Sequence, residues 1–212
     1  MKLTKPEISS ILIVLFHIVG LIGFLTPSLN PLFVKIVPFH LLLMMGLILY
    51  SHSHRNRDFW LFVLVTYFAG FLIEVFGVST GYIFGSYQYG DTLGFKIAEV
   101  PLLIGVNWVI LIYCTGVTIK KLAIQSHVLR SVMGAFFLVF LDFLIEPVAI
   151  KFDYWSWTGM NIPFQNYVAW FIFSFMMLLF FYARQFKKQN PAALVLLLSQ
   201  LVFFAALNLW SF

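Results

Sequence analysis

Long runs of apolar residues, separated by short polar segments, make up most of the chain. A helix needs about 20 mostly apolar residues to cross roughly 30 Å of hydrocarbon. Seven runs meet that requirement, at residues 8–25, 32–50, 59–78, 99–119, 129–150, 164–183 and 191–211. The pattern therefore predicts an all-α integral membrane protein with about seven transmembrane helices, forming one polytopic domain over residues 1–212.

The composition supports this class of protein. Apolar residues make up 62% of the 212 positions and charged residues only 10%. A soluble domain carries about 25% charged residues to cover its surface, so this composition excludes an ordinary soluble fold. The single cysteine, Cys114, lies within an apolar run and excludes an intrachain disulfide.

Lysine and arginine are distributed unevenly between the two sides of the predicted bundle. With a cytoplasmic N-terminus, ten of the 13 lie inside, and only Lys35, Lys96 and Lys151 lie outside. The positive-inside rule therefore predicts a cytoplasmic N-terminus and an external C-terminus, with the protein in the inner membrane of a cell. The net charge of +5 is thus a topology signal and does not indicate nucleic-acid binding. The first span lacks a small-x-small cleavage pattern at residues 25–28, so we expect a retained helix.

Four of the eight acidic residues lie within the predicted spans or at their ends. They are Glu74, Glu99, Asp142 and Glu146. At about 1.5 Å of rise per residue, all four carboxylates fall in the outer third of the bilayer. A charge at depth costs at least ~2.5 kcal/mol, so such residues usually face a protein interior for a functional reason. We predict that these four are catalytic; structural acids bonded to Trp or Tyr side chains are the alternative.

Asp142 and Glu146 are four residues apart, which puts both side chains on one helix face. Two carboxylates this close in a low dielectric do not both ionise, so the pair is expected to keep a proton. A protonated carboxylic acid can act as a general acid. The sequence leaves open which of the two donates the proton.

Residues 71–108 and 143–170 form an internal repeat. Phe71-Leu-Ile-Glu74 recurs as Phe143-Leu-Ile-Glu146, and an aromatic pair, a proline, an asparagine and a tryptophan follow each copy in order. Both copies run in the same direction, so the third and fourth helices should be related to the fifth and sixth by an axis along the membrane normal. The two glutamates would then face each other. The repeated polar and aromatic residues are the predicted substrate-binding residues: Tyr87, Tyr89, Asn107, Trp108, Trp155, Trp157, Asn166 and Trp170.

Other readings of some of these residues remain open. Trp and Tyr also gather at headgroup level in any membrane protein, which is the alternative for the two aromatic pairs. His17 and His40 lie within predicted helices and lack a second ligand three or four residues away. We interpret them as hydrogen-bonded histidines of the bundle, and the sequence predicts no metal site.

Two blocks of sequence carry a resemblance to a known family. The first contains Glu74–Tyr89, Val100–Leu102 and Asn107–Trp108, and the second contains Asp142–Pro147, Trp155–Trp157 and Pro163–Tyr167. Together they cover about residues 70–170, and they resemble the membrane-bound carotenoid 1,2-hydratases of the CruF type. They are more distantly similar to the small integral-membrane lycopene cyclases. The chain departs from the expected Asp-Pro at the end of the fifth helix, where it has Glu146-Pro147.

The resemblance implies addition of water to the terminal 1,2 double bond of a lycopene- or γ-carotene-like carotenoid. Such a reaction needs a proton donor and then capture of a tertiary cation by water. Asp142 or Glu146 is the expected donor, with Glu74 and Asn166 positioning the water. Aromatic faces can stabilise the cation. No metal or redox cofactor is required, and the sequence offers no site for either.

Two other functions use the same residues. A lycopene-type cyclase would also protonate the substrate but would capture the cation with a neighbouring double bond. A proton-coupled transporter would use the carboxylates as a relay, although they gather in one outer layer. A retinal protein is excluded because residues 191–211 contain no lysine. The expected partners are a carotenoid or isoprenoid lipid, membrane lipid and neighbouring enzymes of the carotenoid pathway.

Overall fold

The computed structural model describes residues 2–159 and 161–210, which form seven α-helices and four short strands. The helices are α1 (Lys5–Leu25), α2 (Asn30–Ser51), α3 (Arg57–Thr80), α4 (Leu103–Ile119), α5 (His127–Lys151), α6 (Phe164–Ala183) and α7 (Pro191–Trp210). The strands are β1 (Tyr87–Tyr89), β2 (Lys96–Ile97), β3 (Val100–Pro101) and β4 (Trp155–Trp157). Six helices are long and apolar enough to cross a membrane, and α4 is a shorter apolar helix. The predicted all-α membrane protein with about seven spans is confirmed; position 211 of the last span lies outside the described residues.

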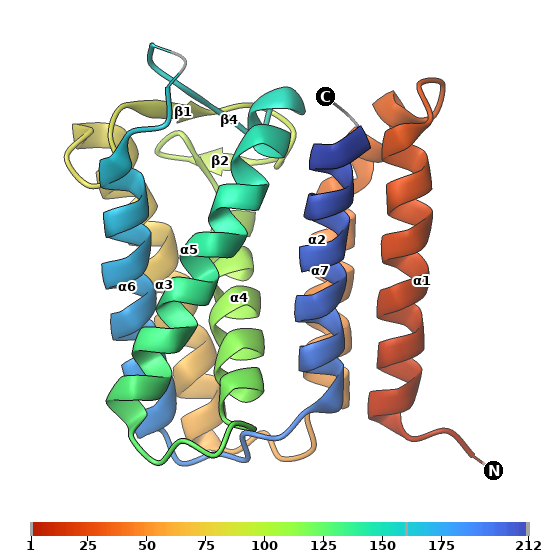
Figure 1. Cartoon of the computed structure of the whole chain (residues 1–212), viewed down its shortest axis with the longest axis vertical. Coiled ribbons are helices and arrows are strands. Elements are labelled where there is room, and N and C mark those ends of the chain that lie inside the picture. The colour runs from red at the N-terminus through yellow and green to blue at the C-terminus, as the bar shows by residue number, and fades with distance from the viewer. Residues whose placement is uncertain (1, 160, 211–212) are drawn as a thin grey trace.

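The helices run alternately up and down, so each is antiparallel to its neighbour in sequence (Figure 1). Helix α4 is the central element and packs against α2, α3, α5, α6 and α7. Every residue of α4 from Val109 to Val117 is buried. Its 17 residues span about 26 Å, which suffices for a central helix that other helices shield from lipid.

Polar caps and glycine set the ends of the helices. Asn56 accepts a hydrogen bond from the backbone N–H of Phe59 and begins α3, and Ser126 caps α5 in the same way. Gly81 adopts a left-handed conformation, with φ of 68°, and ends α3. These local signals explain why α3 and α5 begin, and α3 ends, within a few residues of the bounds of the predicted apolar runs.

The predicted start of the fourth helix at residue 99 is wrong. Residues 96–101 form the antiparallel hairpin of β2 and β3, and α4 begins only at Leu103. Pro101 lacks a backbone N–H and favours an extended conformation at Val100, so a helix that began at residue 99 would be strained. Glu99 occupies the turn of this hairpin with φ of 62° and is exposed.

The loops after α3 and after α5 join at the end of the bundle away from the N-terminal end of α1, which is called the outer end after its predicted orientation. Strand β1 pairs antiparallel with β4, with Tyr87 opposite Trp157 and Tyr89 opposite Trp155. The first aromatic residue of each segment therefore lies opposite the second aromatic residue of the other, on either side of the central pair of residues 88 and 156. This is the relation that a two-fold axis along the membrane normal produces between two parallel repeats.

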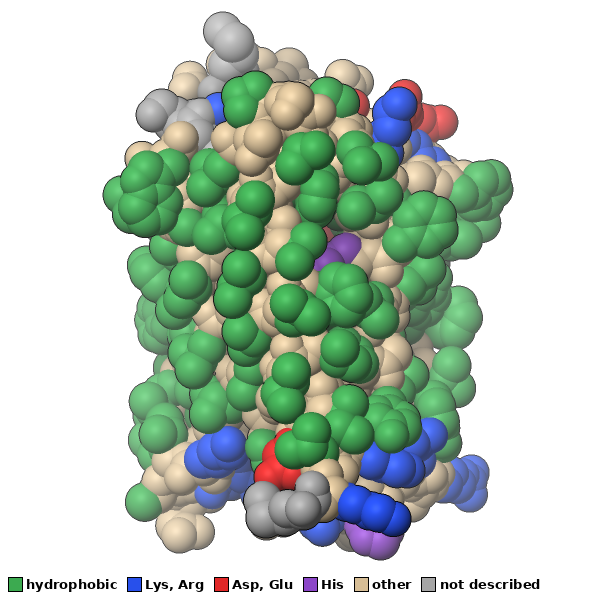
Figure 2. All heavy atoms as spheres, turned by 90° about the vertical axis from the view of Figure 1, so that its right-hand side faces the viewer, with side chains coloured by type: hydrophobic (Ala, Val, Ile, Leu, Met, Phe, Trp, Pro, Cys, Tyr) green, Lys and Arg blue, Asp and Glu red, His purple; other side chains and the backbone are tan. Residues whose placement is uncertain are grey.

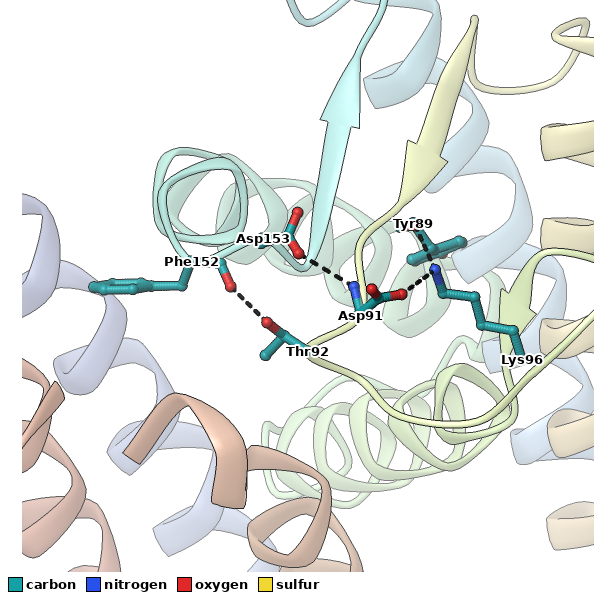
Figure 3. A network of polar contacts seen from close by, with 6 residues as sticks. All are labelled: Tyr89, Asp91, Thr92, Lys96, Phe152 and Asp153. Atoms are coloured by element: carbon teal, nitrogen blue, oxygen red, sulfur yellow. Dashed lines mark hydrogen bonds and ion pairs between the residues drawn. The ribbon is translucent and has the colours of Figure 1, made fainter. Parts of the chain in front are cut away.

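Polar contacts near the strands tie these loops to each other (Figure 3). The Lys96 ammonium donates to the Tyr89 carbonyl at 2.8 Å and forms an ion pair with Asp91 at 2.9 Å. Thr92 donates to the Phe152 carbonyl at 2.8 Å, and the backbone N–H of Asp91 donates to Asp153. The contacts fix the paired strands as a lid over the outer end of the helices.

The side chains on the outside of the bundle suit a lipid environment. Apolar side chains cover most of the height of the face around α1 (Figure 2). Lysine and arginine gather mainly at the end that carries the N-terminal end of α1. The protein is a multi-pass membrane protein, and the cytoplasmic position of its N-terminus stays a prediction.

A polar cluster closes the opposite end of the bundle from the paired strands. The Tyr113 hydroxyl lies 2.7 Å from His52 Nδ1, and Asn190 donates to Ser51 at 2.9 Å and to Tyr113 at 3.3 Å. Phe59 stacks on the His52 ring with the centroids 4.2 Å apart. Burial lowers the pKa of His52, so the ring is neutral at pH 7 and links α2 to α4 and to the segment before α7.

Candidate active site

Glu74 lies near the outer end of α3 and accepts hydrogen bonds from three aromatic side chains. The hydroxyls of Tyr87 and Tyr89 donate to its Oε2 at 2.5 and 2.8 Å, and Trp108 Nε1 donates to Oε1 at 3.1 Å. The glutamate is 5% exposed. Hydrogen bonds from three donors are what a buried carboxylate requires to remain in a protein interior.

Glu146 has the corresponding position on α5, with a different set of donors. Trp155 and Trp157 donate through Nε1 to its Oε2, at 3.0 and 2.8 Å. Asn166 Nδ2 makes a longer contact of 3.3 Å with Oε1. Each repeat segment thus binds its own glutamate with its own aromatic pair, tyrosines in the first copy and tryptophans in the second.

Asp142 lies one turn before Glu146 and is completely buried. Its Oδ2 accepts a hydrogen bond from Asn166 Nδ2 at 2.9 Å, so a single amide group contacts both acids. Its Oδ1 is buried without a hydrogen-bond partner among the described residues. An indole N–H can only donate, so the two tryptophans leave no room for a proton on Glu146 Oε2. On Glu146 the oxygen available for a proton is therefore Oε1, and on Asp142 the oxygen without a donor is Oδ1.

Both glutamates line one cavity beneath the paired strands, which has about 370 Å³ of empty space. Aromatic rings form most of its wall. The rings of Trp108 and Trp170 lie 4.5 Å apart between centroids, and Tyr87 lies 5.1 Å from Trp157. The cavity is lined by Glu74, Phe84, Tyr87, Tyr89, Ile104, Asn107, Trp108, Glu146, Trp155, Trp157, Asn166 and Trp170.

Two glycines of α3 make room for this wall. A Cβ at Gly70 would lie 2.6 Å from the Trp108 side chain, and a Cβ at Gly77 would lie 2.6 Å from Phe84. Neither distance is possible for a real side chain without movement of the ring. Gly70 and Glu74 are one turn apart, so the same helix face admits Trp108 and presents the carboxylate that Trp108 binds.

The two tyrosines are permanent donors to Glu74. Burial, and then the nearby charge of Glu74, raise the pKa of Tyr87 and Tyr89 above the ordinary value of a phenol. Their hydroxyls therefore stay protonated at any physiological pH. A tyrosine hydroxyl can also accept a hydrogen bond, which allows a water molecule in the cavity to bind at the same point.

Most residues predicted from the sequence meet in this cavity. All eight predicted substrate-binding residues line it, together with Glu74 and Glu146. Asp142 lies behind Glu146 and reaches the cavity lining only through Asn166. Glu99 lies in the exposed hairpin turn, so the prediction that groups it with the other three acids is wrong. Phe84 and Ile104 were not predicted, because one apolar residue among many gives no signal in the sequence.

The fold and the cavity define a class: a polytopic membrane protein with a buried carboxylate cavity that aromatic residues surround. The family described as "Carotenoid biosynthesis protein" matches residues 34–212. The chain therefore belongs to the carotenoid biosynthesis protein family.

One curated relative supports the same grouping. The chain is 25% identical over 152 residues to the bisanhydrobacterioruberin hydratase of Haloarcula japonica. The match covers 68% of this chain and 51% of the relative, so the chain spans about half the length of the curated relative it matches. No solved structure matches the chain.

Proposed function

We propose that the protein hydrates a terminal carbon–carbon double bond of an open-chain carotenoid such as lycopene. The observation that carries the proposal is the acid pair Asp142 and Glu146 beside a cavity walled by aromatic rings. The family and the hydratase relative support carotenoid modification as the general role. The particular substrate and the hydration step are the proposed parts.

Glu146 is the proposed proton donor. Of the acid pair, only Glu146 lines the cavity, and its Oε1 is the oxygen without strong donors. Asp142 lies on the same helix face, and two carboxylates in a low dielectric do not both ionise, so the pair shares a proton. Glu146 delivers this proton to one carbon of the terminal double bond, and the π electrons form the new C–H bond.

The positive charge then develops on the other, tertiary carbon inside the aromatic wall. Rings such as Trp108, Trp157 and Trp170 present π faces, each worth roughly 0.5–2 kcal/mol to a nearby cation. Glu74 lines the same cavity, and its three donors, Tyr87, Tyr89 and Trp108, can hold a carboxylate near the cation. The cavity therefore stabilises the cation without a metal or a redox group.

Water completes the addition. Glu74 and Asn166 lie on opposite repeat segments of the cavity wall and position a water molecule between them. The water oxygen bonds to the tertiary carbon, and its extra proton passes to the Asp142–Glu146 pair. One water is added to the lipid, and the pair regains the proton it gave.

Expression of the chain in a lycopene-producing bacterium tests this function. Hydration adds the mass of one or two waters to the pigment, as measured by mass spectrometry of the extract. An unchanged mass with altered absorption identifies cyclisation and contradicts hydration. Pigment that is unchanged in mass and absorption contradicts both reactions on this lipid.

A further inference from the structure

A second and larger cavity lies beside the carboxylate cavity. It has about 1030 Å³ of empty space, which includes space open to the outside of the bundle. Side chains of α1, α2, α4, α5 and α7 line it, and most of them are apolar. We call this cavity the chain groove. Its size and its apolar wall suit a long hydrocarbon.

The chain groove adjoins the carboxylate cavity. Ile104, Asn107 and Trp155 line both, so these three side chains form the boundary between the two spaces. The groove also reaches the outside of the bundle, because its lining includes the exposed residues Phe16 and Val19 of α1. A lipid that enters from the bilayer therefore reaches the side chains that separate the groove from the cavity of Glu146.

Three polar side chains interrupt the apolar wall of the groove. His17 and His40 meet edge to face with their ring centroids 4.9 Å apart, and Gln200 lines the same space from α7. His17 Nδ1 lies 2.8 Å from the carbonyl of Ile13, so the neutral ring donates there and keeps Nε2 as an acceptor. Gln200 is 8% exposed, and its Oε1 is buried without a partner among the described residues.

An unpaired buried amide oxygen is costly to the fold, and a ligand hydroxyl would relieve that cost. All three polar residues lie eight to ten residues from the upper ends of their helices, whereas Glu74 and Glu146 lie six and five residues from the ends of theirs. A group that binds them is therefore carried by the lipid at a distance from the reacting double bond. Hydrocarbon alone would leave Gln200 Oε1 without a hydrogen-bond partner among the described residues.

We propose that the chain groove binds the polyene chain of the substrate and that His17, His40 and Gln200 bind a hydroxyl group on that lipid. The inference rests on the proposed function for the kind of lipid. Beyond the proposed function, the inference names the substrate class: an isoprenoid lipid that already has a hydroxyl group. It also predicts that hydroxylated polyenes bind better than the parent hydrocarbon.

Binding of the chain is tested in lipid nanodiscs with lycopene and its 1-hydroxy derivative, by quenching of tryptophan fluorescence without turnover. A Cβ at Gly20, which lines the groove, would lie 3.5 Å from Phe203, an ordinary contact. Gly20→Leu should therefore fold and fill part of the groove, and its unfolding temperature is measured to check this. This variant should weaken binding of both lipids about 10-fold or more. The matched control is Gly46→Leu, whose Cβ meets nothing within 4 Å, and it should bind as the wild type does.

The hydroxyl site is tested with Gln200→Leu. Loss of one hydrogen bond should weaken binding of the hydroxylated lipid about 3- to 10-fold and leave lycopene unchanged. Without ligand, the variant should unfold at the same or a higher temperature, because it removes an unpaired buried oxygen. A lower unfolding temperature with equal effects on both lipids would show that Gln200 is structural and would overturn the hydroxyl site.

The outcomes separate this inference from the proposed function. If the binding differences appear but no water is added to any pigment, the groove stands and the hydration reaction fails. If Gly20→Leu loses bound phospholipid but binds both polyenes as the wild type does, the groove holds an acyl chain and the inference is wrong.

Discussion

Glu146→Gln is the most informative change in the carboxylate cavity, because it removes a proton and little else. The amide oxygen of glutamine can still accept from Trp155 and Trp157, which now donate to Glu146 at 3.0 and 2.8 Å. The amide nitrogen then occupies the position of Oε1, so the long hydrogen bond of 3.3 Å from Asn166 Nδ2 is lost, because two donors face each other there. Asn166 keeps its shorter hydrogen bond of 2.9 Å to Asp142. The variant should therefore insert and fold normally.

The expected loss follows from the role of the missing proton. A positioned general acid contributes about 10²- to 10⁴-fold, so Glu146→Gln should raise the barrier by about 2.7–5.4 kcal/mol. Asp142→Asn should lose less, because Asp142 lies behind the cavity lining and acts through the shared proton and Asn166. The order of the two effects distinguishes the donor from the residue behind it.

The assay is the yield of hydrated pigment in lycopene-producing cells, divided by the amount of folded protein in the membrane. Asp91→Asn is the control, since Asp91 is 98% exposed and its ion pair with Lys96 contributes at most about 1 kcal/mol. Activity within a factor of two of the wild type is expected for this control. If Glu146→Gln and Asp142→Asn both keep more than a tenth of the activity, the carboxylates are structural and the mechanism is refuted.

Three further results are expected. A reporter that is active only outside the cytoplasm should be active after Phe212 and silent after Lys188; the reverse would overturn the orientation. Tyr113→Phe removes the hydroxyl that His52 contacts at 2.7 Å, so it should lower the free energy of unfolding by about 1–3 kcal/mol in a denaturant titration. Its control is Tyr50→Phe at an exposed position, which should change the free energy of unfolding by less than ~0.5 kcal/mol. Burial lowers the pKa of His52, so protonation of this ring opposes folding, and the stability should fall as the pH drops below about 6.5. In thermal unfolding measured over a range of pH, His52→Gln should show a shallower fall than the wild type.

The helices and the depth of the acids could be predicted because both depend on counting along one chain. Apolar runs of sufficient length must be helices in lipid, since no other segment satisfies its own backbone there. The repeat then brought Glu74 and Glu146 to one cavity, because like positions in parallel repeats lie at like depths. The start of α4 could not be predicted in this way, since Pro101 and the hairpin before it interrupt an apolar run without making it polar.

The chain groove was hidden for a different reason. His17 and His40 lie on different helices and Gln200 on a third, and periodicity along one helix says nothing about contacts between helices. The interpretation of the two histidines as hydrogen-bonded residues of the bundle holds for His17, which bonds Ile13. Their shared space with Gln200 depends on how α1, α2 and α7 pack beside α4, and only the structure gives that arrangement.

The two repeat segments supply different hydrogen-bond donors to their glutamates, so the two sides of the carboxylate cavity differ chemically. Tyrosine hydroxyls, which can donate and accept, bind Glu74, whereas indole groups, which can only donate, bind Glu146. Two indole donors occupy Oε2 of Glu146, so a proton on this residue can lie only on Oε1. In a symmetric cavity with four tyrosines, a proton could lie on either oxygen of either glutamate, because tyrosine hydroxyls can also accept. With tryptophans in the second copy, the proposed acid Glu146 and the proposed water-binding Glu74 have chemically different donors, although they have the same place in the two repeat segments.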